Sequence, residues 1–99
     1  MMKTFAKIRC ADGFTMSVQA GSGGYSSPRM GEGPFTAVEV GFPSAREEML
    51  MEYIDGDPET TEPTGTVYGW VPAEVILKVV TKHGGQIAGE MPWLQLGGE

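Results

Sequence analysis

The stretch TVYGWVPAEVILKVVTKHGG, residues 66–85, decides the fold class of this chain. Residues 66–71 are β-branched and aromatic, which favours a strand. Pro72 follows at a position where a helix tolerates a missing backbone N–H, so a helix is predicted to begin there. Its apolar side chains recur at helical spacing and form one stripe: Val75, Ile76, Val79 and Val80. The sequence therefore predicts a strand that continues directly into a helix.

The end of this helix is equally well marked. Lys82 and His83 fall in its last turn, where the helix dipole stabilises a cation. Gly84 and Gly85 then supply the left-handed residue that commonly ends a helix. We therefore expect His83, the only histidine in the chain, to be a capping cation rather than a catalytic base.

Three runs upstream of residues 66–85 have strand character. Residues 4–10 and 14–20 flank an Asp-Gly dipeptide, which is typical of a hairpin turn, and the second run alternates apolar and polar residues. Residues 35–42 lie between two prolines and are predicted as a third strand. On that strand we expect two faces, one with Val38, Val40 and Phe42 and the other with Phe35, Ala37, Glu39 and Gly41.

The segment between the third strand and residue 66 is ambiguous. Ser44 and Glu47 match a capping box, which favours a helix, whereas residues 49–54 alternate in a way that suits a strand. We favour a turn over residues 43–48 followed by a short strand over residues 49–54. Residues 55–65 contain two prolines and four acids and are predicted as a solvated loop.

Together these patterns predict an α+β fold. A single domain over residues 1–85 would hold a sheet of four or five mainly antiparallel strands, with one C-terminal helix packed on one face. Residues 86–99 are polar and rich in glycine, and we expect them to be a partly ordered tail.

Charge and composition narrow the classes of function. The 99 residues carry a net charge of −6, and residues 35–65 hold eight acids against Arg46 alone, which is −7. This balance argues against direct binding of nucleic acid, which needs a basic surface. The longest apolar runs are too short for a membrane span, and residues 1–13 contain no apolar region, so we expect neither a membrane span nor a secretory signal. The single Cys10 fits a reducing cytoplasm.

The longest predicted loop, residues 21–34, is the first candidate site. It contains five Gly, three Ser and two Pro, and loops of this length that persist in small domains are commonly functional. It lacks the Lys-Ser/Thr pair of a nucleotide P-loop. We expect a ligand-binding set in which the Arg29 guanidinium and two hydroxyls hold an anion: Tyr25, Ser26, Ser27 and Arg29. Alternatively, Arg29 pairs with an acid and Tyr25 packs on the sheet.

A second candidate site combines aromatic and acidic residues. Tyr68 and Trp70 are two apart on a strand, so we expect them to share a face that points away from the helix. Exposed aromatic pairs are common anchors for protein partners. With the acids of the solvated loop they form the predicted partner-binding set: Tyr68, Trp70, Asp55, Asp57, Glu59 and Glu62. Alternatively, the tail or another subunit covers this face, and we expect a homo-oligomer, most simply a dimer.

Residues of the kinds that carry catalysis or metals are poorly placed for either. Asp55, Asp57 and Glu59 resemble the start of a calcium loop, but Pro58 and the absence of glycine at the sixth position disrupt it. Cys10 has no histidine near it in the sequence, and the acids lie in an open loop instead of a cleft. We therefore expect no enzyme activity, no metal and no cofactor.

Five segments together resemble a family of small proteins encoded by tailed phages and prophages: SVQA (17–20), YSSPR (25–29), GPFTAVEVGFPS (33–44), TGTVYGWVP (64–72) and KHGG (82–85). The resemblance covers residues 12–85. It carries over Tyr25, Pro28 and Arg29, while the family often has Cys at the position of Ser26, which argues against an essential thiol there.

The resemblance implies a small accessory protein of the bacterial cytoplasm that counters a host defence by stoichiometric binding. It would act either by sequestering a nucleotide-derived signal in the loop of residues 21–34, or by blocking a defence effector protein, as an anti-CRISPR protein does. The alternative is a minor structural or assembly protein of the phage.

Overall fold

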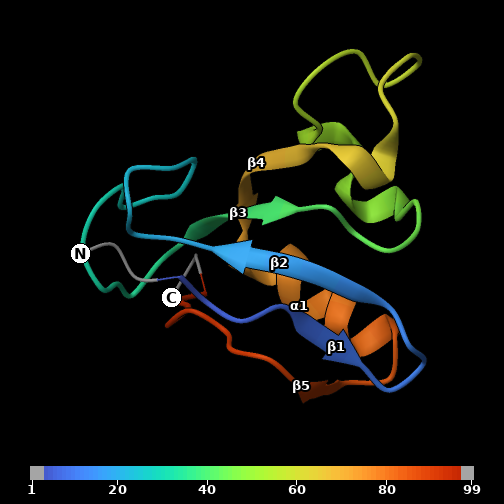
Figure 1. The fold of residues 1–99 in the computed structure, drawn as a ribbon. Helices are drawn as coiled ribbons and strands as arrows, with labels where there is room; N and C mark the ends of the chain where they lie inside the picture. The colour runs from blue at the N-terminus through green and yellow to red at the C-terminus, as the bar shows by residue number, and fades with distance from the viewer. Residues whose placement is uncertain (1–3, 97–99) are drawn as a thin grey trace.

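A computed structural model describes residues 4–96 and contains five strands, one α-helix and two 3₁₀ helices. In chain order, the elements are β1 (Ile8–Cys10), β2 (Thr15–Gln19), β3 (Ala37–Gly41), η1 (Glu48–Tyr53), η2 (Pro63–Gly65), β4 (Val67–Pro72), α1 (Ala73–Lys82) and β5 (Gln86–Ala88) (Figure 1). The predicted α+β class is confirmed, with five strands in the sheet and the one α-helix near the C-terminal end.

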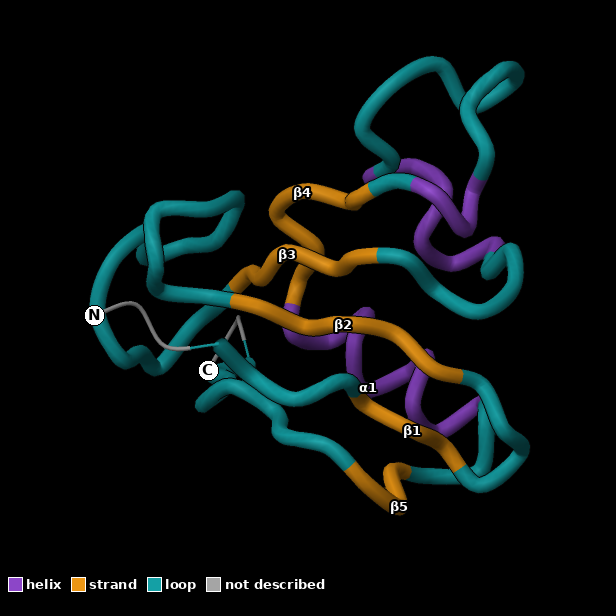
Figure 2. The backbone as a smooth tube through the Cα atoms, in the orientation of Figure 1, coloured by secondary structure: helices purple, strands orange, loops and turns teal. Residues whose placement is uncertain are grey.

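The sheet has the strand order β4-β3-β2-β1-β5, and every neighbouring pair is antiparallel. The helix α1 lies against one face of it, while η1 and η2 lie near β4 (Figures 1 and 2). β4 continues into α1 without a loop, with Pro72 as the N-cap. The chain connection between the sheet and its covering helix is thus as short as the sequence predicted.

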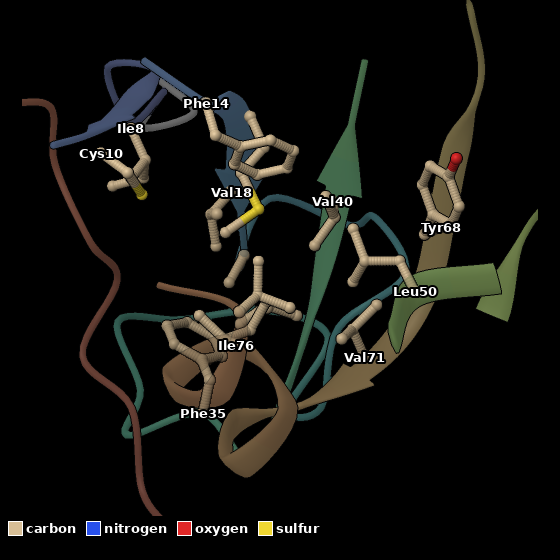
Figure 3. Close-up of a cluster of buried hydrophobic side chains, with 14 of the residues drawn as sticks. Ile8, Cys10, Phe14, Val18, Phe35, Val40, Leu50, Tyr68, Val71 and Ile76 are labelled. Atoms are coloured by element: carbon tan, nitrogen blue, oxygen red, sulfur yellow. The ribbon is translucent and has the colours of Figure 1, made fainter. Parts of the chain in front are cut away.

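The core fills the space between the sheet, α1 and η1 (Figure 3). β2 alternates as predicted, since Phe14, Met16, Val18 and Ala20 are all buried. From α1, Ile76 and Val79 are fully buried, and Val75 and Val80 pack against the cluster. Burial of such aliphatic side chains contributes about 1.5–3 kcal/mol each, so this cluster is the main source of stability.

The predicted strand over residues 49–54 is wrong, and a 3₁₀ helix, η1, takes its place. The Glu47 carboxylate accepts a hydrogen bond from the Met49 N–H at 3.0 Å and caps this helix at its beginning. The neighbours Leu50 and Met51 are both buried, which a helical turn allows and an alternating strand does not. Tertiary burial therefore overrides the alternation of the sequence.

Residues at the C-terminal end join the sheet. β5 lies within the segment that we expected to be a tail, and it pairs with β1. Further along, Leu94 forms a parallel bridge with Phe35, whose N–H donates to the Trp93 carbonyl at 2.7 Å. Phe35 is fully buried beneath this contact, whereas Phe42, at φ +50°, turns outward and is half exposed. The expected faces of residues 35–42 are therefore wrong at both ends.

The expectation that Tyr68 and Trp70 share one exposed face is also wrong. Val38 pairs with Val71 and Val40 pairs with Tyr68, so β4 contains one residue more than β3 over this interval. Such a bulge reverses the alternation of side chains. Trp70 takes up the distortion at φ +50° and is 53% exposed, while Tyr68 is fully buried. The Tyr68 hydroxyl donates to the Pro63 carbonyl at 2.5 Å.

Candidate partner-binding groove

The loop of residues 21–34 folds back on itself and has little free backbone. Ser22 and Met30 form an antiparallel bridge, and Ser27 forms another with Ala37 of β3. Gly21 makes the crossing possible: it has φ +85°, and a Cβ there would lie 2.0 Å from the Gly31 carbonyl oxygen. The loop is therefore an ordered substructure, attached to the edge of β3.

Within this loop, three of the four predicted anion-binding residues make hydrogen bonds in the loop itself or to β3. The Ser26 hydroxyl is buried, donates to the Pro28 carbonyl at 2.8 Å and accepts from the Gly21 N–H. The Arg29 Nε donates to the Gly23 carbonyl at 2.9 Å, and the Ser27 backbone is paired with β3. Tyr25 alone of the set lines a groove together with residues from elsewhere in the chain.

The Tyr25 ring stacks on the Trp70 ring, with centroids 4.8 Å apart and an interplanar angle of 25°. The backbone N–H of Trp70 also donates to the backbone carbonyl of Tyr25 at 3.0 Å, which fixes the loop to β4. Gly69 permits the contact, because a Cβ there would lie 3.2 Å from the Tyr25 side chain. Both rings remain partly exposed, Tyr25 at 39% and Trp70 at 53%. One residue from each predicted site, Tyr25 and Trp70, therefore takes part in this contact.

The stacked pair forms part of a groove of about 380 Å³ that also includes the end of η1. Its lining is Tyr25, Glu52, Tyr53, Ile54, Asp55, Gly69 and Trp70. Two of these residues are carboxylates, and within the described part of the chain the lining contains no Lys, Arg or His. Burial and the neighbouring Glu52 raise the pKa of the Tyr53 hydroxyl, so this phenol stays protonated. The groove is aromatic with a negative rim.

The remaining predicted partner-binding acids lie outside this groove. Asp57 and Glu62 organise their own loop, because their carboxylates accept hydrogen bonds from the N–H groups of Glu59 and Thr64. Glu59 is exposed on the same loop, which projects away from the sheet (Figure 2). Asp55 is the one member of the acidic set that contributes to the groove.

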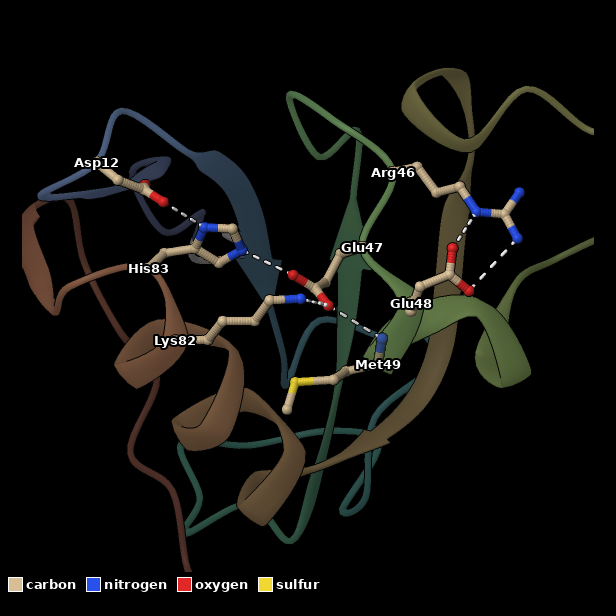
Figure 4. Close-up of polar contacts among 7 residues, drawn as sticks. All are labelled: Asp12, Arg46, Glu47, Glu48, Met49, Lys82 and His83. Atoms are coloured by element: carbon tan, nitrogen blue, oxygen red, sulfur yellow. Dashed lines mark hydrogen bonds and ion pairs between the residues drawn. The ribbon is translucent and has the colours of Figure 1, made fainter.

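A polar cluster outside the groove connects three elements of the fold (Figure 4). We call it the His83 network, and it consists of Asp12, Glu47, Lys82 and His83. The His83 Nδ1 lies 2.6 Å from the Asp12 Oδ2, and its Nε2 lies 2.7 Å from the Glu47 Oε1. The Lys82 Nζ donates to the other Glu47 oxygen at 2.9 Å. The imidazole also stacks on Phe14, with centroids 4.0 Å apart. His83 is the C-cap of α1, so the network attaches the end of the helix to the β1–β2 turn and to η1.

The pKa shifts in this network show that its positive and negative groups stabilise each other in the charged form. Burial works against the charged imidazole, but hydrogen bonds to Glu47 and Asp12 outweigh it and raise the pKa of His83. Burial also opposes charge on Glu47, yet the Met49 N–H and the two cations lower its pKa. The Phe14 N–H and His83 lower the pKa of Asp12. The raised pKa of His83 and the lowered pKa values of its two carboxylate partners all favour the charged forms, so the network holds the three elements together.

Sequence reasoning missed this cluster because Glu47 and His83 lie 36 positions apart. The one available signal was Glu47 itself, which the capping-box pattern singled out. Over residues 4–96, His, Cys, Asp and Glu side chains form no group that could hold a metal ion. The helices of the same range include none long and apolar enough to cross a membrane.

Comparison with known proteins adds nothing to this geometry: no protein-family model, no curated protein and no solved structure matches the chain.

Proposed function

We propose that this chain is a phage-encoded accessory protein that acts in the bacterial cytoplasm and counters a host defence system by stoichiometric binding of an effector protein. The phage context comes from the sequence resemblance. The observation that supports protein binding is the exposed Tyr25–Trp70 stack at the rim of an acidic groove. Stacked, partly exposed aromatics supply large contact area at low entropic cost, and they are enriched among the residues that dominate protein interfaces.

Of the two modes of binding, the groove favours the blocking of an effector over the sequestration of a nucleotide-derived signal. The Ser26 hydroxyl and one N–H of the Arg29 guanidinium, at Nε, already hydrogen-bond within their own loop. Glu52 and Asp55 line the groove and would repel a phosphate. A basic protein surface, in contrast, is complementary to this rim and to the acidic loop of residues 55–62.

The direct test is a plaque assay in bacteria that carry a defence system, with and without expression of the chain. Expression should restore plaque formation, and Trp70→Asn should abolish the effect. Asn is chosen because it tolerates the positive φ of this position. Loss of a central aromatic anchor weakens binding by about 2 kcal/mol or more, which is about 30-fold.

The matched control is Trp93→Ala, which removes a tryptophan that is 63% exposed but does not line the groove. The Trp93→Ala variant should restore plaque formation as well as the unmodified chain does. Two results would contradict the proposal. Cyclic nucleotides or ADP-ribose derivatives that raise the melting temperature would favour signal sequestration. Many copies of the chain in purified virions would favour a structural or assembly protein.

A further inference from the structure

We infer that the groove holds an arginine side chain of the partner, an inference that rests on the proposed function and names the chemistry of its contact. The exposed faces of the two aromatic rings offer a surface for a cation. Tyr25 and Trp70 stack on each other and still leave part of their surface exposed. The face of an aromatic ring carries negative electrostatic potential, and a cation within about 6 Å of its centre is attracted to it.

Charge in the groove points to the same class of ligand. Glu52 and Asp55 both line it and are exposed to solvent, and none of its described lining residues is cationic. The Asp55 backbone is fixed, because its N–H donates to the Val67 carbonyl at 2.9 Å. A positive group that lies against the aromatic pair would therefore also be close to carboxylate oxygens on a positioned backbone.

Arginine fits this combination better than lysine does. The guanidinium is planar and weakly hydrated, so it stacks on an aromatic ring while its N–H groups pair with a carboxylate. An ammonium is compact and strongly hydrated, and it would give up more of its hydration in the same place. The groove, at about 380 Å³, is at the small end of ligand pockets, which suits one long side chain.

The test uses Trp70 as the reporter. Trp70 and Trp93 are the two tryptophans of the chain, so Trp93→Phe leaves Trp70 as the source of tryptophan fluorescence. Short capped peptides Gly-Arg-Gly, Gly-Lys-Gly and Gly-Glu-Gly are titrated at millimolar concentration. The arginine peptide should change the emission in a saturable way, the lysine peptide should bind about 2- to 5-fold more weakly, and the glutamate peptide should have no effect.

Charge variants test the rim. In the Trp93→Phe variant, the double change Glu52→Gln with Asp55→Asn should weaken the binding of the arginine peptide by about 5- to 10-fold. Asp57→Asn with Glu59→Gln removes the same charge just outside the groove and should change the affinity less than about twofold. Equal losses in both pairs would mean general charge attraction, and equal binding of the arginine and lysine peptides would overturn the choice of arginine.

The plaque assay keeps this inference separate from the proposed function. Saturable binding of the arginine peptide without restoration of plaques would support the arginine site and contradict the proposed function in host defence. Plaque restoration that needs Trp70 but not Glu52 and Asp55 would leave the function and overturn the inference. A dimer in light scattering that Trp70→Asn dissociates to the monomer mass of 10.6 kDa would also overturn it, because a second copy would then occupy the groove.

Discussion

The Nε2 of His83 lies 2.7 Å from the Oε1 of Glu47, while the Nδ1 of the same ring lies 2.6 Å from the Asp12 Oδ2. A neutral imidazole has one N–H and can donate to one carboxylate only. When both carboxylates are ionised, only the doubly protonated ring can donate to the two of them at once. The contact between His83 and Glu47 links the end of α1 to the beginning of η1, and the stability of this junction depends on the charge of one histidine.

Stability should fall as the solution is made alkaline. The folded-state pKa of His83 is raised, so its contribution is fully present below the ordinary histidine pKa of about 6.5 and is lost as pH rises through the folded-state value. We expect the free energy of unfolding from urea titrations to be lower at about pH 7.5 than at about pH 6, a window that ends below the ordinary cysteine pKa of about 8.5 and so keeps the Cys10 thiol protonated. His83→Gln should flatten this slope. An unchanged slope in the variant would assign the pH dependence to other groups.

Acidification should weaken the same junction, because it protonates the two carboxylates that pair with His83. The folded-state pKa values of Glu47 and Asp12 are lowered, so their contribution is present above their ordinary pKa values of about 4 and is lost as pH falls through the folded-state values. Glu47→Gln should therefore lose part of the acid dependence of the urea midpoint. The neighbouring Glu48 also has a lowered pKa, because it pairs with Arg46, but solvent screens this exposed pair, so Glu48→Gln should change the acid dependence less than Glu47→Gln does.

Removal of the Glu47 carboxylate should be costly at neutral pH. Glu47→Ala leaves the Met49 N–H, the Lys82 ammonium and one side of His83 without this acceptor. Glu47 is 2% exposed, but the Lys82 side chain is 51% exposed, so water can replace part of its lost contact. Loss of hydrogen bonds to a charged group typically costs about 1.5–3 kcal/mol. Glu48→Ala should cost less than about 1 kcal/mol, as exposed ion pairs do. Similar losses for the two variants, measured by urea unfolding, would mean that the network contributes little.

Gly21 and Gly13 form a matched pair for backbone effects. Both have positive φ, but a Cβ at Gly21 would lie 2.0 Å from the Gly31 carbonyl oxygen, whereas a Cβ at Gly13 would have nothing within 4 Å. Gly13→Ala should cost about 1–2 kcal/mol from backbone strain alone. Gly21→Ala adds the clash and should cost clearly more, with a lower thermal midpoint. Equal costs would show that the loop of residues 21–34 rearranges freely.

Tyr68→Phe tests the bulge in β4. Because Tyr68 is buried and its hydroxyl donates to the Pro63 carbonyl, removal of the hydroxyl should cost about 1 kcal/mol of unfolding free energy. Tyr25→Phe keeps the exposed ring and should change stability by less than about 0.5 kcal/mol. A neutral Tyr68→Phe would mean that the hydrogen bond to Pro63 contributes little to stability.

The sequence by itself determined the elements whose signals are local. The alternation over residues 14–20, the helical stripe that includes Ile76 and Val79, and the glycines after His83 each lie within one element, and the structure confirms all three. Periodicity and capping report how a segment meets its nearest neighbours. The α+β class follows from local patterns of this kind.

Tertiary structure decided the rest. Residues 49–54 carry a strand pattern, yet Leu50 and Met51 both reach the core because η1 is helical. The extra residue in β4 separates Tyr68 from Trp70, and its position depends on the pairing with β3. The Tyr25–Trp70 stack and the His83–Glu47 contact join residues 45 and 36 positions apart. Such contacts depend on how separate elements pack together, and no local pattern in the sequence encodes that packing.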